Sequence, residues 1–247
     1  MEINEKKHKK EQQFLKRVVG SQEFIHCEER WCLWITDEQL SVAQSIPPIR
    51  ERIESVRQAR LSGDKSAQKL AARAHQFRET NMPEKYTLVI PSVSSENRVY
   101  MQIGYVSKNF VVTNLAFAIY DAEPWVFGLI SSKMHNLWIR TVCGGLETRL
   151  RYSNVLGYNT FPVPQLSDEQ KQNIAEAALG VLVERENNSE LSMMELYNPD
   201  TMPDGLKYAH KILDEVVESC YKAGGFISDQ ERLDEMFMLY KSLKEAK

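Results

Sequence analysis

At 247 residues, with 43% hydrophobic and 26% charged side chains, the chain can bury the core of one large domain or two smaller ones. This balance excludes a disordered chain, and no apolar run approaches the roughly 20 residues of a membrane-spanning helix. The lysine-rich start lacks the apolar centre of a secretory signal. We therefore expect a cytoplasmic protein that does not associate with membranes.

The formal net charge of −3 is unevenly distributed along the chain. Residues 1–163 carry 22 Lys and Arg against 17 Asp and Glu, a net charge of +5. Residues 164–247 carry 9 against 17, a net charge of −8. A basic segment joined to an acidic one favours a protein with one surface for a polyanion, although many enzymes share such an imbalance.

The opening residues predict a helix that ends at Gly20, since glycine is common just after a helix C-terminus. Its apolar edge consists of Phe14, Leu15, Val18 and Val19. Residues 31–35 contain two tryptophans and predict a short buried strand. Pro47 and Pro48 predict the start of the next helix, because proline is tolerated in a first turn.

Positive charge gathers on this second helix and on the stretch that follows it. Lysine and arginine side chains of this kind bind the phosphates of a nucleic acid. A solvated helical face is the alternative interpretation. The candidate phosphate-binding residues are Arg50, Arg57, Arg60 and Arg73.

The middle of the chain is rich in β-branched and aromatic residues with short polar breaks, which predicts β-strands. Strands are expected at residues 86–90, 99–105, 110–113 and 115–120. A helix at 124–141, a polar loop at 143–151 and an extended piece at 155–161 follow.

Beyond Pro164 the sequence predicts three amphipathic helices with short connections, which favour a small bundle. Ser167 and Ser228 each precede Gln or Glu by three residues, the spacing of a capping box at a helix start. The apolar stripes of these helices indicate core positions.

No catalytic constellation is evident. The glycine pairs at 144–145 and 224–225 lack the strand–turn–helix context of a loop that holds a methyl donor, and residues 197–200 predict only a turn. The four cysteines lack zinc-ribbon spacing and are expected to be free thiols. A metal site that uses His26, Cys27 and Cys32 is the alternative for an enzyme.

Several stretches, in their order along the chain, resemble the target-recognition and C-terminal domains of the MmeI-like (Type IIL) restriction–modification enzymes. They are GSQEFI at 20–25, RWCLWI at 30–35, IPSVSSE at 90–96 with Arg98 and Tyr100, WIRTVCG at 138–144, LETRLRYS at 146–153, YNTFP at 158–162, and the pairs Leu196-Tyr197, Met202-Pro203, Ala209-His210 and Leu213-Asp214. The family tends to place arginine at positions 97 and 145, where this chain has Asn97 and Gly145, and proline where it has Gln102.

The resemblance implies a DNA-recognition module of an adenine-N6 DNA methyltransferase. The family's methyltransferase and nuclease parts would lie before Met1, so the methyltransferase is expected in cis or as a separate subunit. S-adenosylmethionine would bind there, and this segment is expected to hold neither a cofactor nor a catalytic centre.

Two polar clusters are candidate base readers, because arginine, carboxylate and amide side chains have the donor and acceptor patterns that match base edges in the major groove. Residues 147, 149 and 151 alternate, so in an extended segment their side chains point the same way. A surface ion pair between Glu147 and Arg149 is the alternative. The candidates are Glu147, Arg149, Arg151, Ser94, Ser95, Glu96 and Arg98.

The sequence therefore predicts an α+β protein in which a β-rich target-recognition domain with flanking helices precedes a small C-terminal helical bundle. The expected boundaries are 1–20 for an N-terminal helix or linker from the methyltransferase part, 21–163 for the recognition domain and 164–247 for the helical domain. Double-stranded DNA is the expected partner. A protein-interaction subunit whose acidic bundle docks on a separate methyltransferase is the rival hypothesis.

Overall fold

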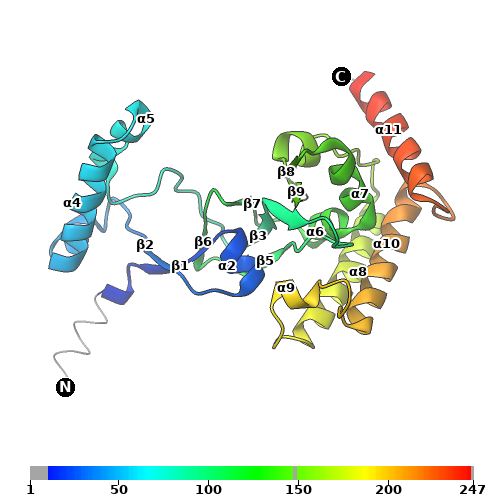
Figure 1. Cartoon of the computed structure of the whole chain (residues 1–247), viewed down its shortest axis with the longest axis horizontal. Coiled ribbons are helices and arrows are strands. Elements are labelled where there is room, and N and C mark those ends of the chain that lie inside the picture. The colour runs from blue at the N-terminus through cyan, green and yellow to red at the C-terminus, as the bar shows by residue number, and fades with distance from the viewer. Residues whose placement is uncertain (1–10, 147–148, 246–247) are drawn as a thin grey trace. The chain divides into compact units, whose positions relative to one another are not determined.

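The computed structural model describes residues 11–146 and 149–245, and it divides into two compact units (Figure 1). The smaller unit comprises Met1–Val18, Glu29–Met82 and Asn109–Val111. The larger unit comprises Val19–Glu28, Pro83–Lys108 and Val112–Lys247. The chain therefore passes between the units several times.

The smaller unit combines a three-stranded sheet with short helices. In the sheet, β1 (Leu15–Val19) lies between β2 (Trp31–Leu33) and β6 (Phe110–Val112), and β1 and β2 are antiparallel. The helical elements are α3 (Leu40–Gln44), α4 (Pro47–Leu61), α5 (Lys65–Gln68) and the 3₁₀ helix η1 (Ala71–Arg73). Its buried apolar cluster consists of Phe14, Ile35, Ala43 and Ile49.

Two sequence predictions for the start of the chain are wrong. Residues 15–19 form strand β1 rather than the end of a helix, because they pair with β2 and include two β-branched valines. Gly20 is the N-cap of α2 (Ser21–His26), where its amide donates to Glu23 Oε2 at 2.8 Å. The predicted strand at 31–35 is confirmed for β2 only, and Trp31 is 53% exposed rather than buried.

The larger unit contains two three-stranded sheets. In the first, β3 (Tyr86–Pro91) is central and antiparallel to both β5 (Gly104–Ser107) and β7 (Ala116–Tyr120). In the second, β9 (Arg149–Arg151) is central and antiparallel to both β4 (Val93–Ser95) and β8 (Gly145–Leu146). The second sheet is called the recognition sheet below.

Helices supply most of the core of the larger unit. The predicted helix at 124–141 is two helices, α6 (Pro124–Ser131) and α7 (Lys133–Val142), because the Ser132 side chain caps α7 by accepting the His135 amide. The three predicted C-terminal helices are present as α8 (Asp168–Glu186), α10 (Asp204–Tyr221) and α11 (Asp229–Glu245), with α9 (Met193–Leu196) between the first two. The Ser167–Gln170 capping box is confirmed.

The C-terminal helices belong to the same core as the sheets. Figure 1 shows α8 and α10 running beside each other, and α8 also packs on α6. At Gly128 of α6 an added Cβ would lie 2.5 Å from Ile174 Cγ2 of α8, so this close approach requires glycine. Trp138 of α7 contacts the rings of Phe237 and Tyr240 in α11. The mixed α+β fold predicted from the sequence is confirmed.

Three local predictions in this unit are wrong. Residues 99–103 precede β5 as irregular chain, of which 101–103 are buried, and Gln102 donates to the Met193 carbonyl at 3.0 Å. Parts of the predicted loop at 143–151 form β8 and β9, which pair with each other, and β9 also pairs with β4, which is distant in sequence. The predicted extended piece contains the π-helical turn η2 (Asn154–Tyr158). In the part of the chain that is described, no helix has the length and apolarity to cross a bilayer.

Candidate nucleic-acid interface

The recognition sheet brings the two predicted base-reading clusters together. Ser95 of β4 lies opposite Arg149 of β9, and Val93 lies opposite Arg151. Residues directly opposite each other in an antiparallel pair project to the same face of a sheet. One face therefore carries Ser95, Arg149 and Arg151, although Ser95 lies more than 50 residues before the two arginines in the sequence.

The side chains of β9 alternate between solvent and core. Arg149 and Arg151 are exposed, whereas Leu150 and Tyr152 are buried. The prediction that these two arginines share a face is thus confirmed. Glu147, the third member of the predicted set, lies outside the described residues. The remaining predicted reader on β4, Ser94, is buried opposite Leu150 and belongs to the inner face.

The Tyr152 hydroxyl fixes this strand to the core. It lies 3.1 Å from Nε2 of His135, a fully buried residue whose pKa is lowered to about 3 by burial. The neutral imidazole is therefore the form present near neutral pH, and it can bond to the hydroxyl without placing a charge in the core. The Tyr152 amide also donates to the Ser92 carbonyl at 2.9 Å.

The segment after β4 presents Glu96 and Arg98. Glu96 is exposed, while Arg98 is half-buried and burial lowers its pKa. The backbone of this segment is held by α7. Arg140 donates through Nη1 to the Glu96 carbonyl at 2.9 Å and through Nη2 to the Arg98 carbonyl, and Asn136 Nδ2 donates to the Val99 carbonyl.

Neither Arg140 nor Asn136 was predicted from the sequence to support the interface. The two lie four positions apart and therefore on one face of α7, where Arg140 Nε also donates to Asn136 Oδ1 at 3.1 Å. The spacing of four residues between these two polar side chains was the available signal.

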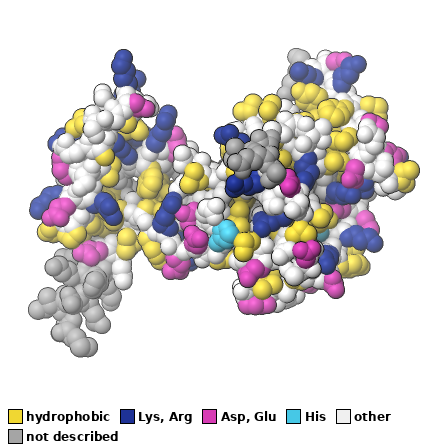
Figure 2. Space-filling view, viewed as in Figure 1, with side chains coloured by type: hydrophobic (Ala, Val, Ile, Leu, Met, Phe, Trp, Pro, Cys, Tyr) yellow, Lys and Arg dark blue, Asp and Glu magenta, His cyan; other side chains and the backbone are white. Residues whose placement is uncertain are grey.

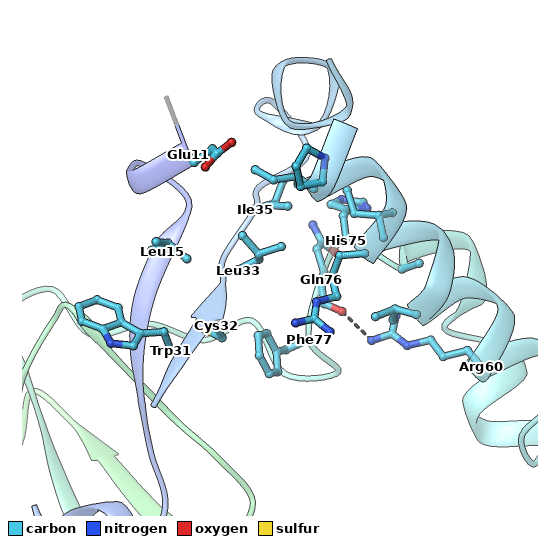
Figure 3. Close-up of a pocket in the computed structure, with 16 residues that line it drawn as sticks. Glu11, Leu15, Trp31, Cys32, Leu33, Ile35, Arg60, His75, Gln76 and Phe77 are labelled. Carbon is cyan, nitrogen blue, oxygen red and sulfur yellow. Dashed lines mark hydrogen bonds between the residues drawn. The ribbon is translucent and has the colours of Figure 1, made fainter. Parts of the chain in front are cut away.

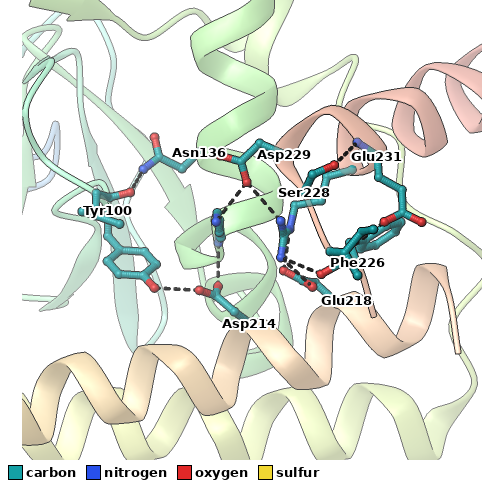
Figure 4. Close-up of polar contacts among 12 residues, drawn as sticks. Tyr100, Asn136, Asp214, Glu218, Phe226, Ser228, Asp229 and Glu231 are labelled. Carbon is teal, nitrogen blue, oxygen red and sulfur yellow. Dashed lines mark hydrogen bonds and ion pairs between the residues drawn. The ribbon is translucent and has the colours of Figure 1, made fainter. Parts of the chain in front are cut away.

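A buried polar network joins the same region to the C-terminal helices (Figure 4). Asp214 of α10 accepts the Tyr100 hydroxyl at 2.6 Å and the Lys133 amide at 2.7 Å. Burial raises the pKa of this carboxyl group to about 6, against the lowering effect of its two hydrogen bonds. The Lys133 ammonium in turn lies 2.9 Å from Asp229 at the start of α11.

The same network continues through an arginine of α11. Arg232 forms a bidentate pair with Glu218 of α10, at 2.8 and 3.0 Å, and also contacts Asp229 at 3.0 Å. Arg232 and Glu218 are both buried. The acidic C-terminal part of the chain thus uses several of its carboxylates as internal supports.

The four predicted phosphate-binding arginines have different surroundings in the smaller unit. Arg50 is exposed on α4. Arg57 is paired with Glu54 at 2.9 Å, and half-buried Arg73 donates to the Arg78 carbonyl at 2.7 Å. On the face seen in Figure 2, basic and acidic side chains are interspersed over this unit. The charge is therefore not concentrated in one basic patch on that face.

Arg60 has a structural role. Its guanidinium donates to the carbonyls of Leu70, Arg73 and Gln76 at 2.7–2.8 Å, so it fastens the end of α4 to η1 and to the residues on either side of η1. It lines one end of a cavity of about 720 Å³ beside the sheet, with Leu15, Leu33 and Ile35 among the apolar lining residues (Figure 3).

The metal-dependent alternative gains no support from the described residues. Within residues 11–146 and 149–245, no three His, Cys, Asp or Glu side chains are grouped to hold a metal ion. Cys27 is exposed and Cys32 is half-buried, and both are free thiols.

Comparisons with known proteins identify the family to which this chain belongs. The family model of the MmeI target recognition domain matches residues 1–165, and that of the MmeI C-terminal domain matches residues 166–246. The chain therefore belongs to the MmeI target-recognition family, which confirms the resemblance found in the sequence.

DNA methyltransferase A of Bacillus subtilis (strain 168) is 43% identical to this chain over 233 residues, which are 94% of this chain and 26% of that protein. The solved structure of the Type IIL restriction–modification enzyme MmeI in complex with DNA matches with a TM-score of 0.90 at 37% identity. That match covers 99% of this chain and 33% of the solved chain. The chain thus spans about a quarter to a third of the length of these relatives.

Proposed function

We propose that this chain reads a specific sequence of double-stranded DNA on behalf of a restriction–modification DNA methyltransferase. The observation that carries the proposal is the outer face of the recognition sheet. There, Arg149 and Arg151 project to solvent from a strand whose alternate residues are locked in the core, beside the anchored segment that carries Glu96 and Arg98. Fixed donors on a rigid support are what base reading requires.

The reaction that this recognition serves is proposed to be adenine-N6 methylation. The methyltransferase part, with its S-adenosylmethionine, would be joined in cis or supplied as a separate subunit. Support comes from the lengths of the relatives, since both are proteins much longer than this chain. The acidic helices would then support the recognition domain rather than bind DNA themselves.

A boundary between a recognition domain and a helical domain near Pro164 is also proposed, with residues 1–20 leading in from the methyltransferase part. The two family models meet at the same place. We infer that residues 164–247 do not fold alone, because Ile174 and Leu213 belong to the same buried cluster as Leu88 of β3. These helices would lack much of their core without the sheets.

Within the recognition surface, Glu147 and Arg149 are proposed to read one base pair together. Arginine donates twice to guanine O6 and N7, and glutamate accepts from the amino group of the paired cytosine. Support comes from Arg149, which projects to solvent from β9 two residues after Glu147 in the sequence. Arg151, Ser95, Glu96 and Arg98 would contact neighbouring positions. Ser94 is left out of this contact set, because it is buried.

The proposed function is tested by enrichment from a randomised duplex library with the full chain. One sequence should be enriched, and binding to it should weaken nearly linearly on a plot of log K against log salt, since phosphate contacts release counterions. A chain that enriches no sequence at low salt, or binds DNA independently of salt, would overturn the proposal.

The pair Glu147 and Arg149 is tested in the enzyme that contains this chain. The double exchange Glu147→Lys with Arg149→Asp should turn a C·G preference into G·C at one position, and each single exchange should cost about 1–3 kcal/mol of discrimination. Mapping of methylated sites measures the result. An unaltered recognition sequence with full activity would mean that the two side chains only pair with each other.

A further inference from the structure

Arg140 binds the backbone of the recognition segment and not its side chains. It leaves the last turn of α7 and donates to two carbonyls of the segment, those of Glu96 and Arg98. Asn136, one turn earlier, holds the next carbonyl, that of Val99, and also accepts from Arg140 Nε. Three of the four carbonyls from residue 96 to residue 99 are therefore bound by one face of one helix.

The helix that provides these contacts is firmly held in the core. Met134, Trp138 and Ile139 of α7 are almost completely buried. The first turn of α7 is fixed as well, because the Lys133 amide donates to Asp214 of α10. Residues 96–99 are thus tied to a helix that is packed on the same core as β9.

We propose that Arg140 is a positioning residue for DNA recognition, which holds the 96–99 backbone in register with Arg149 and Arg151 of β9. The inference rests on the proposed function of the recognition sheet. Its physical basis is that base discrimination depends on donors and acceptors kept in fixed places. A planar guanidinium carries its N–H groups on separate nitrogens in a fixed fork that matches two spaced carbonyls. Lysine has its three N–H groups on one nitrogen at the end of a flexible stem and does not reproduce this geometry.

A direct contact between Arg140 and a DNA phosphate is the alternative role, since the side chain is exposed. The two roles predict different responses to the loss of charge. A phosphate contact would contribute about one unit to the salt dependence of binding, and lysine would largely replace it. A backbone clamp contributes nothing to the salt dependence, and lysine cannot replace it.

The experiment compares Arg140→Lys and Arg140→Gln with the unmodified full chain. The probes are the duplex that the unmodified chain enriches from a random library and a scrambled duplex of the same composition. Arg78→Lys changes an exposed arginine that pairs with the adjacent Glu79, and it is the matched control. Thermal unfolding verifies that each variant folds, as expected for a change at an exposed side chain.

Both Arg140 variants should lower the ratio of specific to scrambled binding by about tenfold, the lower part of the range for one good base contact. Their salt slopes should equal that of the unmodified chain, and amide exchange at residues 96–99 should become faster. The control should change none of these quantities.

The outcomes distinguish a failure of the proposed function from a failure of the positioning role of Arg140. If the unmodified chain enriches no sequence, the proposed function fails and the positioning role fails with it. If it enriches a sequence but the specificity ratio survives in both Arg140 variants, the positioning role alone is wrong. A salt slope lowered by about one unit in Arg140→Gln, with Arg140→Lys unaffected, would establish the phosphate contact instead.

Discussion

The two units of the molecule differ in the interactions that stabilise the interior of each. The larger unit has an extensive core to which β3, α7, α8 and α10 all contribute, and its buried carboxylates are paired or hydrogen-bonded. The smaller unit has a core cluster of four buried apolar residues beside a cavity, and Arg60 ties one helix to the chain after it. The comparison teaches that a surface which must present side chains in fixed places is built on the deeper core.

The largest expected difference between the units is the cost of removing a core side chain. Leu213→Ala in α10 should lower the free energy of unfolding by about 3–5 kcal/mol, because Leu213 is completely buried. The matched change Ile49→Ala in the smaller unit should cost about 2 kcal/mol, since its cluster is small and adjoins a cavity. Chemical denaturation measures both. Equal losses of the free energy of unfolding would contradict the expected difference between the two cores.

The next largest effect is a pH dependence of the stability of the larger unit, caused by Asp214. The folded-state pKa of Asp214 is about 6, above the ordinary 3.8, so its stabilising contribution is complete below pH 3.8 and is lost as the pH rises through 6. In Asp214→Asn, the side-chain amide replaces the protonated carboxyl group as the hydrogen-bond partner of the Tyr100 hydroxyl and of the Lys133 backbone N–H. The pH dependence of stability that Asp214 causes should then disappear. Relative to this variant, the unmodified chain should lose up to about 3 kcal/mol between pH 4 and pH 7, at about 1.4 kcal/mol per pKa unit.

Denaturation of both chains across that pH range is the measurement. The difference between them isolates Asp214 from the other acidic groups, including Glu218, which adds a small repulsion in the same direction. A difference that stays constant with pH would contradict the assignment of this shift to Asp214.

The smallest expected effect compares two arginines of the smaller unit. Arg50→Ala should reduce the slope of log K against log salt for duplex DNA by about one unit while stability changes by less than about 0.5 kcal/mol. Arg60→Ala should leave the slope unchanged and cost about 1–3 kcal/mol, because three hydrogen bonds from a charged donor are lost. The reverse pattern would show that Arg60 faces DNA and Arg50 does not.

Local signals in the sequence predicted the helices well. Pro47 and Pro124 mark the starts of α4 and α6, and the capping box at Ser167 marks the start of α8. These signals act through neighbouring backbone amides, so one sequence contains all the information they need.

Elements that depend on distant partners were predicted less well. Strand β1 has an apolar spacing that also fits a helix, and only its pairing with β2 decides between them. β8 and β9 are only two and three residues long, and β9 is a strand because it pairs with both β4 and β8. The candidate site followed the same division. The shared direction of Arg149 and Arg151 followed from their spacing, whereas the contacts of Arg140 with residues 96 and 98 depend on tertiary structure.

The alternation of β9 also determines how this surface can diversify. Substitution at position 149 or 151 exchanges an outward group and leaves Leu150 and Tyr152 in the core. Insertion or deletion of a single residue ahead of Leu150 would reverse every side chain of the strand, placing arginine in the core and leucine in water. Lineages that acquire new specificities are therefore expected to vary the identity of alternate residues while the length of the strand is inherited unchanged.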